Sequence, residues 1–433
     1  MFCIQLLQLL ETGVGAGRLA QLYAPDGSRA ALAAAKERAV QTVRAFQEEF
    51  TPPPYAHTAL FSGPGRTELA GNHTDHQHGH VLCASVDLDI LACAASNELG
   101  RVRILSQGYP MVEVDLDDLE VHEEEKNTSA ALVRGVAARI RELGYSLSGF
   151  DAYAVSDVLS GSGLSSSAAY EILIGNIFNH FCCGDKMDAV TLAKVGQYAE
   201  NVYFGKPCGL MDQMGSSIGG AVAIDFNDPA DPVVERVGYD FGKSGYELCI
   251  VDTGSSHGDL TGDYAAITRE MGAVAAHFKE AVLRDVPESE FRGAMGALRK
   301  ECGDRAVLRA MHFYADDRRA VQEAGALRTG DFARFLSLMN ESGLSSELYL
   351  QNTWSPADPR QQAVQLALAL GRELLGGAGS IRVHGGGFAG TIQAFVPHEK
   401  LSLFKSGMEK LLGKGRCHVL HIRPVGGCVV LGD

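Results

Sequence analysis

A run rich in glycine and serine lies between a predicted strand and a predicted helix, and it consists of Gly161, Ser162, Gly163, Leu164, Ser165, Ser166 and Ser167. Glycines let a backbone turn its N–H groups inward, and the start of a helix carries partial positive charge. Such a loop can hold phosphate oxygens, and the serine hydroxyls add donors for phosphate or for a hydrated metal. The run lacks the lysine of a Walker A loop, so the cradle would be of another type. The alternative is an ordinary loop that ends in a serine N-cap.

A second polar cluster surrounds Arg66 and continues through Gly71, Asn72, His73, Thr74, Asp75 and His76. Closely spaced donors and acceptors on a glycine-bounded loop suit a polyhydroxylated ligand, because every ligand hydroxyl needs a partner once it leaves water. Four histidines, at positions 73, 76, 78 and 80, also raise the possibility of zinc. Their spacing matches no standard zinc frame, and we favour histidines that contact substrate or solvent.

Two further motifs carry a carboxylate and a glycine triplet. Asp212 lies in the segment PCGLMDQ, and a carboxylate among apolar residues usually has a partner or a function. The alternative role for Asp212 is a helix cap. The segment HGGGFAG at 384–390 follows a predicted strand, and its three successive glycines predict a close approach of the backbone to a ligand or to another loop.

Taken in this order, the motifs resemble those of the galactokinases in the GHMP superfamily of small-molecule kinases. GRTELAGNHTDHQHGHVL is similar to the galactokinase signature around the sugar site, and GSGLSSSAAYE is similar to the ATP loop of the superfamily. PCGLMDQ resembles the segment of the catalytic aspartate, and HGGGFAGT the third glycine motif. The resemblance covers about residues 37 to 430. It implies an α+β, two-domain GHMP-kinase-like architecture with the active site in the cleft between the domains.

The resemblance also implies a role for each matching residue. Asp212 would take the proton of the sugar's anomeric hydroxyl, and Arg66 would stabilise the charge on the transferring phosphoryl group. Ser167 and Glu200 would bind Mg²⁺. Residues 161–167 would hold the ATP phosphates, with a further nucleotide contact from Ser106. The sugar would be contacted by Asn72, His73, Thr74, Asp75, Gly209 and Tyr264.

These roles imply an ATP- and Mg²⁺-dependent kinase that makes galactose 1-phosphate. Phosphoryl transfer needs mainly positioning and electrostatic stabilisation, which this set of residues can supply. Two positions depart from the family, which usually has glutamate at Asn72 and glycine at Ala389. Asn72 opens the alternative of a kinase for an acidic or amino hexose, because a lost negative charge removes repulsion against a substrate carboxylate. A third alternative is a sensor that binds sugar and ATP without catalysis. The presence of Arg66, Glu200 and Asp212 argues against this alternative.

The elements that must position these residues follow from apolar spacing and from helix and strand breakers. Strands are expected at 60–65, 80–95, 101–107, 111–119, 150–158 and 246–254, with another at 380–383. Helices are expected at 28–50, 129–144, 168–181, 188–205, 263–282, 290–302, 305–324, 331–341 and 361–375. We expect an N-terminal helical extension over 1–36, one GHMP-type domain over 37–235 and a second over 236–433. A segment with two Asp-Pro steps at 228–240 marks the junction.

Composition limits the classes of partner. The chain has 433 residues, with 38 Lys and Arg against 53 Asp and Glu, a formal net charge of −15. This balance argues against nucleic acid and anionic membranes as partners, and leaves a small-molecule sugar and ATP. Ten cysteines without a C-x-x-C pair favour a reducing cytoplasm, and the first residues predict an amphipathic helix and not a signal peptide. A monomer or weak homo-oligomer is expected.

Overall fold

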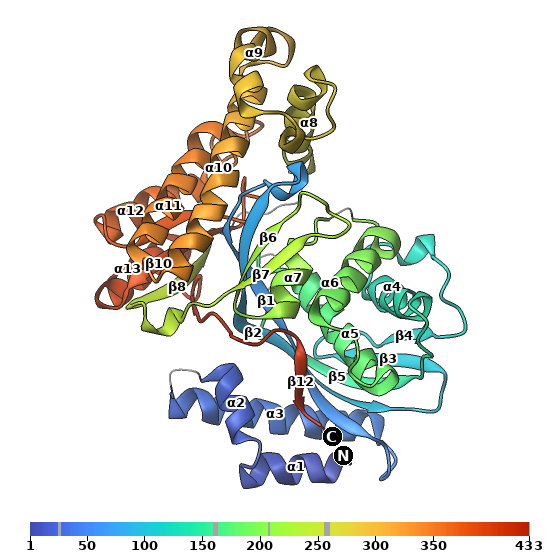
Figure 1. The fold of residues 1–433 in the computed structure, drawn as a ribbon. Coiled ribbons are helices and arrows are strands. Elements are labelled where there is room, and N and C mark those ends of the chain that lie inside the picture. Colours follow the sequence, from blue (N-terminus) through green and yellow to red (C-terminus); the bar gives the residue numbers. More distant parts are fainter. Residues whose placement is uncertain (25–26, 159–162, 207, 255–259, 433) are drawn as a thin grey trace.

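A computed structural model describes residues 1–24, 27–158, 163–206, 208–254 and 260–432, and it contains a larger and a smaller β-sheet, each covered by helices (Figure 1). The strands are β1 (Thr58–Ala70), β2 (His80–Ser96), β3 (Arg101–Ser106), β4 (Val112–Asp115), β5 (Phe150–Ser156), β6 (Ala221–Asp225), β7 (Val233–Val237), β8 (Tyr246–Asp252), β9 (Ser380–His384), β10 (Thr391–Pro397), β11 (Cys417–Leu420) and β12 (Cys428–Leu431). The helices are α1 (Cys3–Thr12), α2 (Ala16–Tyr23), α3 (Arg29–Phe50), α4 (Ser129–Glu142), α5 (Ser166–Cys183), α6 (Ala189–Tyr198), α7 (Met211–Ile218), α8 (Thr261–His277), α9 (Glu288–Glu301), α10 (Asp304–Arg328), α11 (Phe332–Ser345), α12 (Ala363–Leu375) and α13 (Leu401–Leu412). No described helix has the length and apolar character that a membrane crossing requires.

The larger sheet has the strand order β12-β1-β2-β5-β3-β4, and β6 pairs with both β2 and β7. Every residue of β1 is buried, because this strand lies inside the sheet and helices cover it. The pairing of β1 with β2 is antiparallel and shifts register between Pro64 and Arg66 and again between Glu68 and Ala70. Arg66 and Glu68 therefore lie on a short regular stretch between two irregularities.

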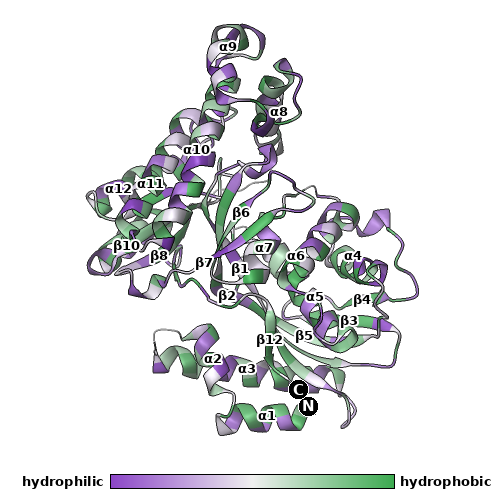
Figure 2. Ribbon diagram, in the orientation of Figure 1, coloured by the Kyte–Doolittle hydropathy of each residue, from purple (hydrophilic) through white to green (hydrophobic). Residues whose placement is uncertain are grey.

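Helices cover both faces of the larger sheet. Phe61 and Ala92 pack with residues of α5, whereas Leu60 and Leu91 point to the opposite face and pack with α1, α2 and α3. The predicted N-terminal amphipathic helix is confirmed as α1, which buries Leu6 and Leu10. Figure 2 shows hydrophobic and hydrophilic residues alternating along α1–α3, as expected for helices that bury one side.

The smaller sheet has the order β11-β8-β10-β9 and is also buried on both faces. Cys249 and Val251 of β8 pack with residues of α12 and α13, while Phe395 of β10 packs on the other face with Phe335 of α11. The strand β9 leads directly into the glycine triplet at 385–387, and β10 begins just after it. The glycine motif therefore lies at one end of this sheet.

The α+β class is confirmed, and most expected elements are present within a few residues. The helix expected over 188–205 is α6 followed by a π-helical turn over Ala199–Phe204. The helix expected to reach residue 282 ends at His277, because Lys279 adopts a left-handed backbone conformation with φ of 67°. Within the expected junction, β7 pairs with β6 of the larger sheet, and the last strand β12 returns to pair with β1.

A buried cluster around Asp89 of β2 joins the chain ends to the larger sheet. Its Oδ1 accepts a hydrogen bond from Arg38 Nη1 of α3 at 2.6 Å. Its Oδ2 accepts from Tyr23 at 2.6 Å and Arg423 at 3.1 Å, and also from Ser62. Burial alone would raise the pKa of Asp89, but the charges of Arg38 and Arg423 outweigh it and hold the pKa below its usual value.

We predict that Asp89→Ala lowers the free energy of unfolding by about 3–5 kcal/mol, because it leaves Arg423 buried without its charge partner. Since the folded pKa of Asp89 is lowered, this contribution is present at neutral pH and is lost as the pH falls through the acid range. Denaturant unfolding at pH 7 measures the change. The control is Glu11→Ala, which removes an ion pair with Arg44 that is more than half exposed and should cost at most about 1 kcal/mol. Equal effects of the two substitutions would contradict the prediction.

Candidate active site

A cavity of about 200 Å³ lies where the larger sheet, α7 and the end of the smaller sheet meet. Its walls come from three regions that are far apart in the sequence. They are formed by Arg66, Glu68, His73, Asp75, His76, Lys206, Cys208, Gly209, Met211, Asp212, Gly385 and Gly386. The fold thus brings together three of the four motifs that the sequence singled out, and the glycine- and serine-rich loop lies directly behind Arg66 and Asp212.

The central interaction of this cavity is the ion pair of Arg66 and Asp212. Arg66 projects from β1, and its Nε and Nη2 both lie 2.7 Å from Asp212 Oδ1, at the first turn of α7. Asp212 Oδ2 accepts a hydrogen bond from the Ser165 hydroxyl. Burial would raise the pKa of Asp212, but the charge and hydrogen bonds of Arg66, with help from Ser165, hold the pKa below its usual value. The carboxylate is therefore ionised at neutral pH.

The glycine- and serine-rich loop contacts the same pair through its backbone. The carbonyl of Gly163 accepts a hydrogen bond from Arg66 Nη1, and the carbonyl of Leu164 accepts one from the Arg66 N–H at 3.1 Å. Gly163 and Ser165 both have positive φ, 71° and 54°, which turns the chain sharply into α5. Ser166 begins that helix, and Leu164 is buried beneath it. Gly161 and Ser162 lie outside the described residues.

Ser167 and Glu200 are brought together, as the resemblance implies for a metal site. The Ser167 hydroxyl lies 3.1 Å from Glu200 Oε1, and the Lys206 ammonium lies 3.1 Å from the same oxygen. The amide of Gln213 donates to Glu200 Oε2 at 2.8 Å and to Glu171 Oε2 at 2.9 Å. Burial, followed by the charge of Glu200, raises the pKa of Glu171 well above its usual value. One amide thus bridges two carboxyl groups behind the cavity.

Asn72 lies behind the cavity wall. Its amide nitrogen donates to Glu68 Oε1 at 3.1 Å and to the carbonyl of Gly385 at 2.7 Å. Its amide oxygen accepts from Ser346 at 3.2 Å and Asn352 at 2.9 Å. The residue is fully buried and does not appear among the cavity-lining residues. The side chain of Asn72 therefore connects the cavity wall to the segments behind it.

The following residues divide between the wall and its support. His73 lines the cavity, and its Nε2 lies 2.9 Å from the carbonyl oxygen of Gly386. Burial, with the nearby His76, lowers the pKa of His73 to about 4, so its ring is neutral at pH 7 and donates to that carbonyl. Thr74 is buried, and its hydroxyl donates to the carbonyls of Gly71 and His80 at 2.9 and 2.6 Å. Thr74 thus closes the turn, whereas His73 faces the cavity.

Asp75 and Gly209 lie next to each other in the cavity wall. A Cβ on Gly209 would lie 2.6 Å from Asp75 Oδ2, so a larger residue there would displace the Asp75 carboxylate. The Oδ1 of Asp75 accepts the backbone N–H of His76 at 2.9 Å. Two acceptors of the predicted sugar set, Asp75 and the backbone near Gly209, therefore lie side by side.

Tyr264 and Ser106 lie outside the cavity wall. The Tyr264 hydroxyl donates to the carbonyl of Gly387 at 2.8 Å, and a Cβ on Gly386 would collide with the tyrosine ring at 2.4 Å. Tyr264 therefore fixes the glycine triplet. Ser106 ends β3, opposite Ala154 of β5 in a parallel pairing. Ser106 therefore lies at the same end of the sheet as the last residues of β5, the strand that precedes the glycine- and serine-rich loop in the sequence.

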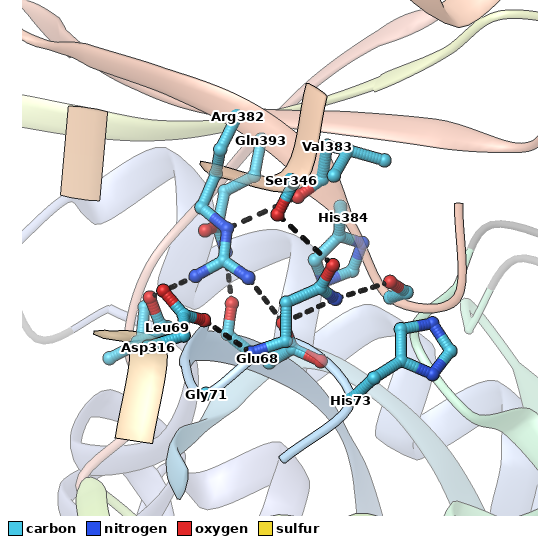
Figure 3. A network of polar contacts seen from close by, with 12 residues as sticks. Glu68, Leu69, Gly71, His73, Asp316, Ser346, Arg382, Val383, His384 and Gln393 are labelled. Carbon is cyan, nitrogen blue, oxygen red and sulfur yellow. Dashed lines mark hydrogen bonds and ion pairs between the residues drawn. The ribbon is translucent and has the colours of Figure 1, made fainter. Parts of the chain in front are cut away.

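Glu68 and Arg382 were not singled out from the sequence. Arg382 of β9 is fully buried, donates to the carbonyl of Leu69 at 2.7 Å and pairs with Glu68 Oε1, as Figure 3 shows. Burial raises the pKa of Glu68 to about 7, although Arg382 and Arg66 oppose the rise. Two sequence signals pointed to this pair. Glu68 shares a strand face with Arg66, and Arg382 is a charge inside an apolar strand.

Two family models match the chain. The model described as GHMP kinases N terminal domain matches residues 131–220, which include the glycine- and serine-rich loop and Asp212. The model described as galactokinase galactose-binding signature matches residues 44–96, which include Arg66, Glu68 and the loop from Gly71 to His80.

Several solved structures share the fold. A galactokinase from Lactococcus lactis, complexed with galactose, is 24% identical, with 91% of this chain and 100% of that chain covered and a TM-score of 0.76. A mevalonate kinase from L. major in complex with R-mevalonate is 12% identical, with 86% and 98% covered and a TM-score of 0.60. A D-glycero-D-manno-heptose 1-phosphate kinase from Bacteriodes thetaiotaomicron is 16% identical, with 86% and 98% covered and a TM-score of 0.56.

We predict that Arg66→Met raises the pKa of Asp212, because it removes the charge and hydrogen bonds that lower that pKa while burial remains. Carboxyl ¹³C NMR of aspartate-labelled protein follows the titration directly. The control is Arg103→Met, which breaks an ion pair with Asp151 on β5 and should leave the Asp212 signal unchanged. An Asp212 pKa that is the same in Arg66→Met and in the unaltered protein would refute the assignment.

Proposed function

Because the chain belongs to the galactokinase branch of the GHMP kinases, we propose that it transfers the γ-phosphoryl group of ATP to the anomeric hydroxyl of galactose. The observation that carries this proposal is the placement of Asp212. An ionised carboxylate opens onto a cavity of polar side chains, and Arg66 joins it to the backbone of the glycine- and serine-rich loop. An acceptor site and a phosphate site are thereby linked through one guanidinium.

Asp212 would accept the hydrogen bond of the anomeric hydroxyl and align its oxygen for attack on the γ-phosphorus. A carboxylate with a lowered pKa is a weak base, so orientation comes first and proton transfer follows late in the reaction. Arg66 keeps Asp212 ionised and adds positive charge next to the transferring group. Residues 163–167 would hold the phosphates with backbone N–H groups at the start of α5.

The residues at the proposed metal site fit Mg²⁺. This ion takes oxygen ligands in an octahedron, in which neighbouring oxygens are about 3 Å apart. Ser167 Oγ and Glu200 Oε1 are 3.1 Å apart, and Gln213 fixes the other carboxylate oxygen. When bound, Mg²⁺ neutralises charge on the ATP phosphates. Lys206 shares the same carboxylate oxygen and would place a further positive charge beside them.

Galactose is favoured over an acidic or amino hexose. The galactose-binding signature spans the whole loop that contains Asn72. The carboxyl group that is missing at Asn72 is present nearby, because Glu68 Oε1 lies 3.1 Å from the Asn72 amide nitrogen and Glu68 lines the cavity together with Asp75. An acidic sugar would thus meet the carboxyl groups of Glu68 and Asp75, so the missing charge at Asn72 no longer favours a substrate with a carboxylate.

The proposal also covers the cellular compartment and the oligomeric state. All ten cysteines are free thiols, which supports a reducing cytoplasm as the site of action. The substrates would be the sugar and ATP, and we propose a monomer or weak homo-oligomer.

We predict that the purified protein releases ADP with galactose in a coupled assay over a panel of monosaccharides, and that Asp212→Asn lowers kcat roughly 10²–10⁴-fold with ATP affinity retained. The control is Asp231→Asn, a carboxylate on the surface that pairs with Lys194 and should keep full activity. Turnover of no hexose by the unaltered protein would refute the kinase. Tight binding of galactose and ATP without ADP release, measured by calorimetry with Mg²⁺ present, would instead favour a sensor.

We further predict that kcat/KM for galactose exceeds that for galacturonate by at least about tenfold, because the sugar carboxylate would approach Glu68 and Asp75 across a partly screened site. Steady-state rates with both sugars at pH 8 measure the ratio. A ratio near one, or a preference for galacturonate, would restore the acidic-sugar alternative.

A further inference from the structure

Glu68 combines burial with an unused hydrogen-bonding oxygen on the cavity wall. The residue is 4% exposed and lines the cavity. Asn72 and Arg382 both donate to its Oε1. Among the described residues, no side chain or backbone group donates to Oε2. One carboxylate oxygen is therefore available to a ligand.

Other buried carboxylates that pair with arginine use both oxygens. In Asp89, Oδ1 accepts from Arg38 and Oδ2 accepts from Tyr23, Ser62 and Arg423. In Asp316, Oδ1 accepts from Arg319 and Oδ2 accepts the N–H of Asn72. These two arginine-paired carboxylates thus satisfy both oxygens, as expected from the cost of burying an unpaired acceptor. Glu171 and Glu323, which form no ion pair with arginine within the described part of the chain, leave buried carboxyl oxygens without a partner there, away from the cavity. Glu68 departs from this pattern at the point where it meets the cavity.

The position of Glu68 relative to Arg66 indicates which part of a sugar it would reach. The two side chains project from the same face of β1, two residues and roughly 7 Å apart along the strand. Arg66 holds Asp212, which is the proposed partner of the anomeric hydroxyl. Glu68 is therefore displaced along the cavity towards the side of a pyranose ring remote from its anomeric carbon.

The neighbours of Glu68 fix the direction of its carboxylate. Arg382 is fully buried and is itself held by the carbonyl of Leu69 at 2.7 Å. The Asn72 amide cannot rotate freely, because Ser346 and Asn352 hold its oxygen. The backbone carbonyl of Glu68 accepts from Gln393 of β10 at 2.9 Å. Figure 3 shows Arg382 and Gln393 reaching from the strands of the smaller sheet to the Glu68 region of β1. Such a supported acceptor is preorganised for one ligand position.

We propose that Glu68 selects the sugar by accepting a hydrogen bond from one hydroxyl remote from the anomeric carbon, at C3, C4 or C6, with Arg382 and Asn72 as positioning residues. This inference rests on the proposed function and extends it to the choice of substrate. The hydroxyl donates to Oε2, while Arg382 and Asn72 keep Oε1 occupied. A sugar without that hydroxyl would leave Oε2 buried and unpaired.

The test compares galactose with 3-deoxy-, 4-deoxy- and 6-deoxygalactose in steady-state kinetics and calorimetry. For galactose, Glu68→Ala should raise the sugar KM and Kd roughly 10- to 100-fold, with the KM for ATP unchanged. For one of the deoxy sugars, the unaltered protein and Glu68→Ala should have nearly equal KM, because the hydrogen bond is already missing. Asn72→Ala should raise the galactose KM, and should add little in the double variant with Glu68→Ala.

A matched control separates recognition from stability. Glu68→Gln and Asp89→Asn each convert an arginine-paired, buried carboxylate to an amide. Both should lower the melting temperature, but only Glu68→Gln should change the galactose KM and the ranking of the deoxy sugars. If Glu68→Ala does not fold, Glu68→Gln carries the same comparison.

The outcomes distinguish this inference from the proposed function. If galactose is phosphorylated but the Glu68 variants leave KM and the deoxy-sugar ranking unchanged, or weaken every deoxy sugar equally, Glu68 is only structural and the inference is wrong. If no hexose is phosphorylated but galactose binds, the proposed reaction fails, and the Kd of the Glu68 variants still decides the inference. If no hexose binds, both are overturned.

Discussion

The buried ion pair of Glu68 and Arg382 is the constraint on which the cavity depends. It joins β1 of the larger sheet to β9 of the smaller sheet, and Arg382 also binds the backbone carbonyl of Leu69. A charge this deeply buried is tolerated only when it is paired, so each sheet requires the other at this point. The loop that begins at Gly71 and the glycine triplet at 385–387 leave from the two joined strands and therefore meet across the cavity.

The same principle places Asp212. Arg66, two residues before Glu68 on β1, binds both the carboxylate of Asp212 and the carbonyl of Gly163. One strand thus presents two charged side chains on one face, the first directed to α7 and the glycine- and serine-rich loop, the second to the smaller sheet. Because the pairs are buried, solvent screens their charges little. The pKa of Asp212 is lowered and that of Glu68 is raised. At Asp212 the charge and hydrogen bonds of Arg66 outweigh burial, whereas at Glu68 burial outweighs the charges of Arg382 and Arg66.

Asn72 illustrates why a motif alone could mislead. In the sequence it lies within a polar loop and differs from the family at a position expected to contact sugar. In the structure its amide nitrogen reaches back to Glu68, and its amide oxygen is taken by Ser346 and Asn352 from the far half of the chain. Glu68, four residues earlier, contributes a carboxyl group to the cavity wall beside those of Asp75 and Asp212. The alternation of side chains along a strand predicts that Glu68 shares a face of β1 with Arg66. Only the tertiary contacts show that Glu68 lines the cavity while Asn72 lies behind it.

The sequence by itself determined the local elements and the motifs. The α3 helix follows from its serine N-cap and the apolar spacing of Val40, Val43 and Phe46, and the turn after Gly163 follows from glycine and serine chemistry. These features depend on residues close together in the chain. Tertiary structure alone decided that β12 returns to β1, that Tyr264 supports the glycine triplet, and that Arg382 meets Glu68. Such contacts join residues more than a hundred positions apart. Burial, charge pairing and the register of the two sheets select these contacts together, and no local sequence pattern encodes them.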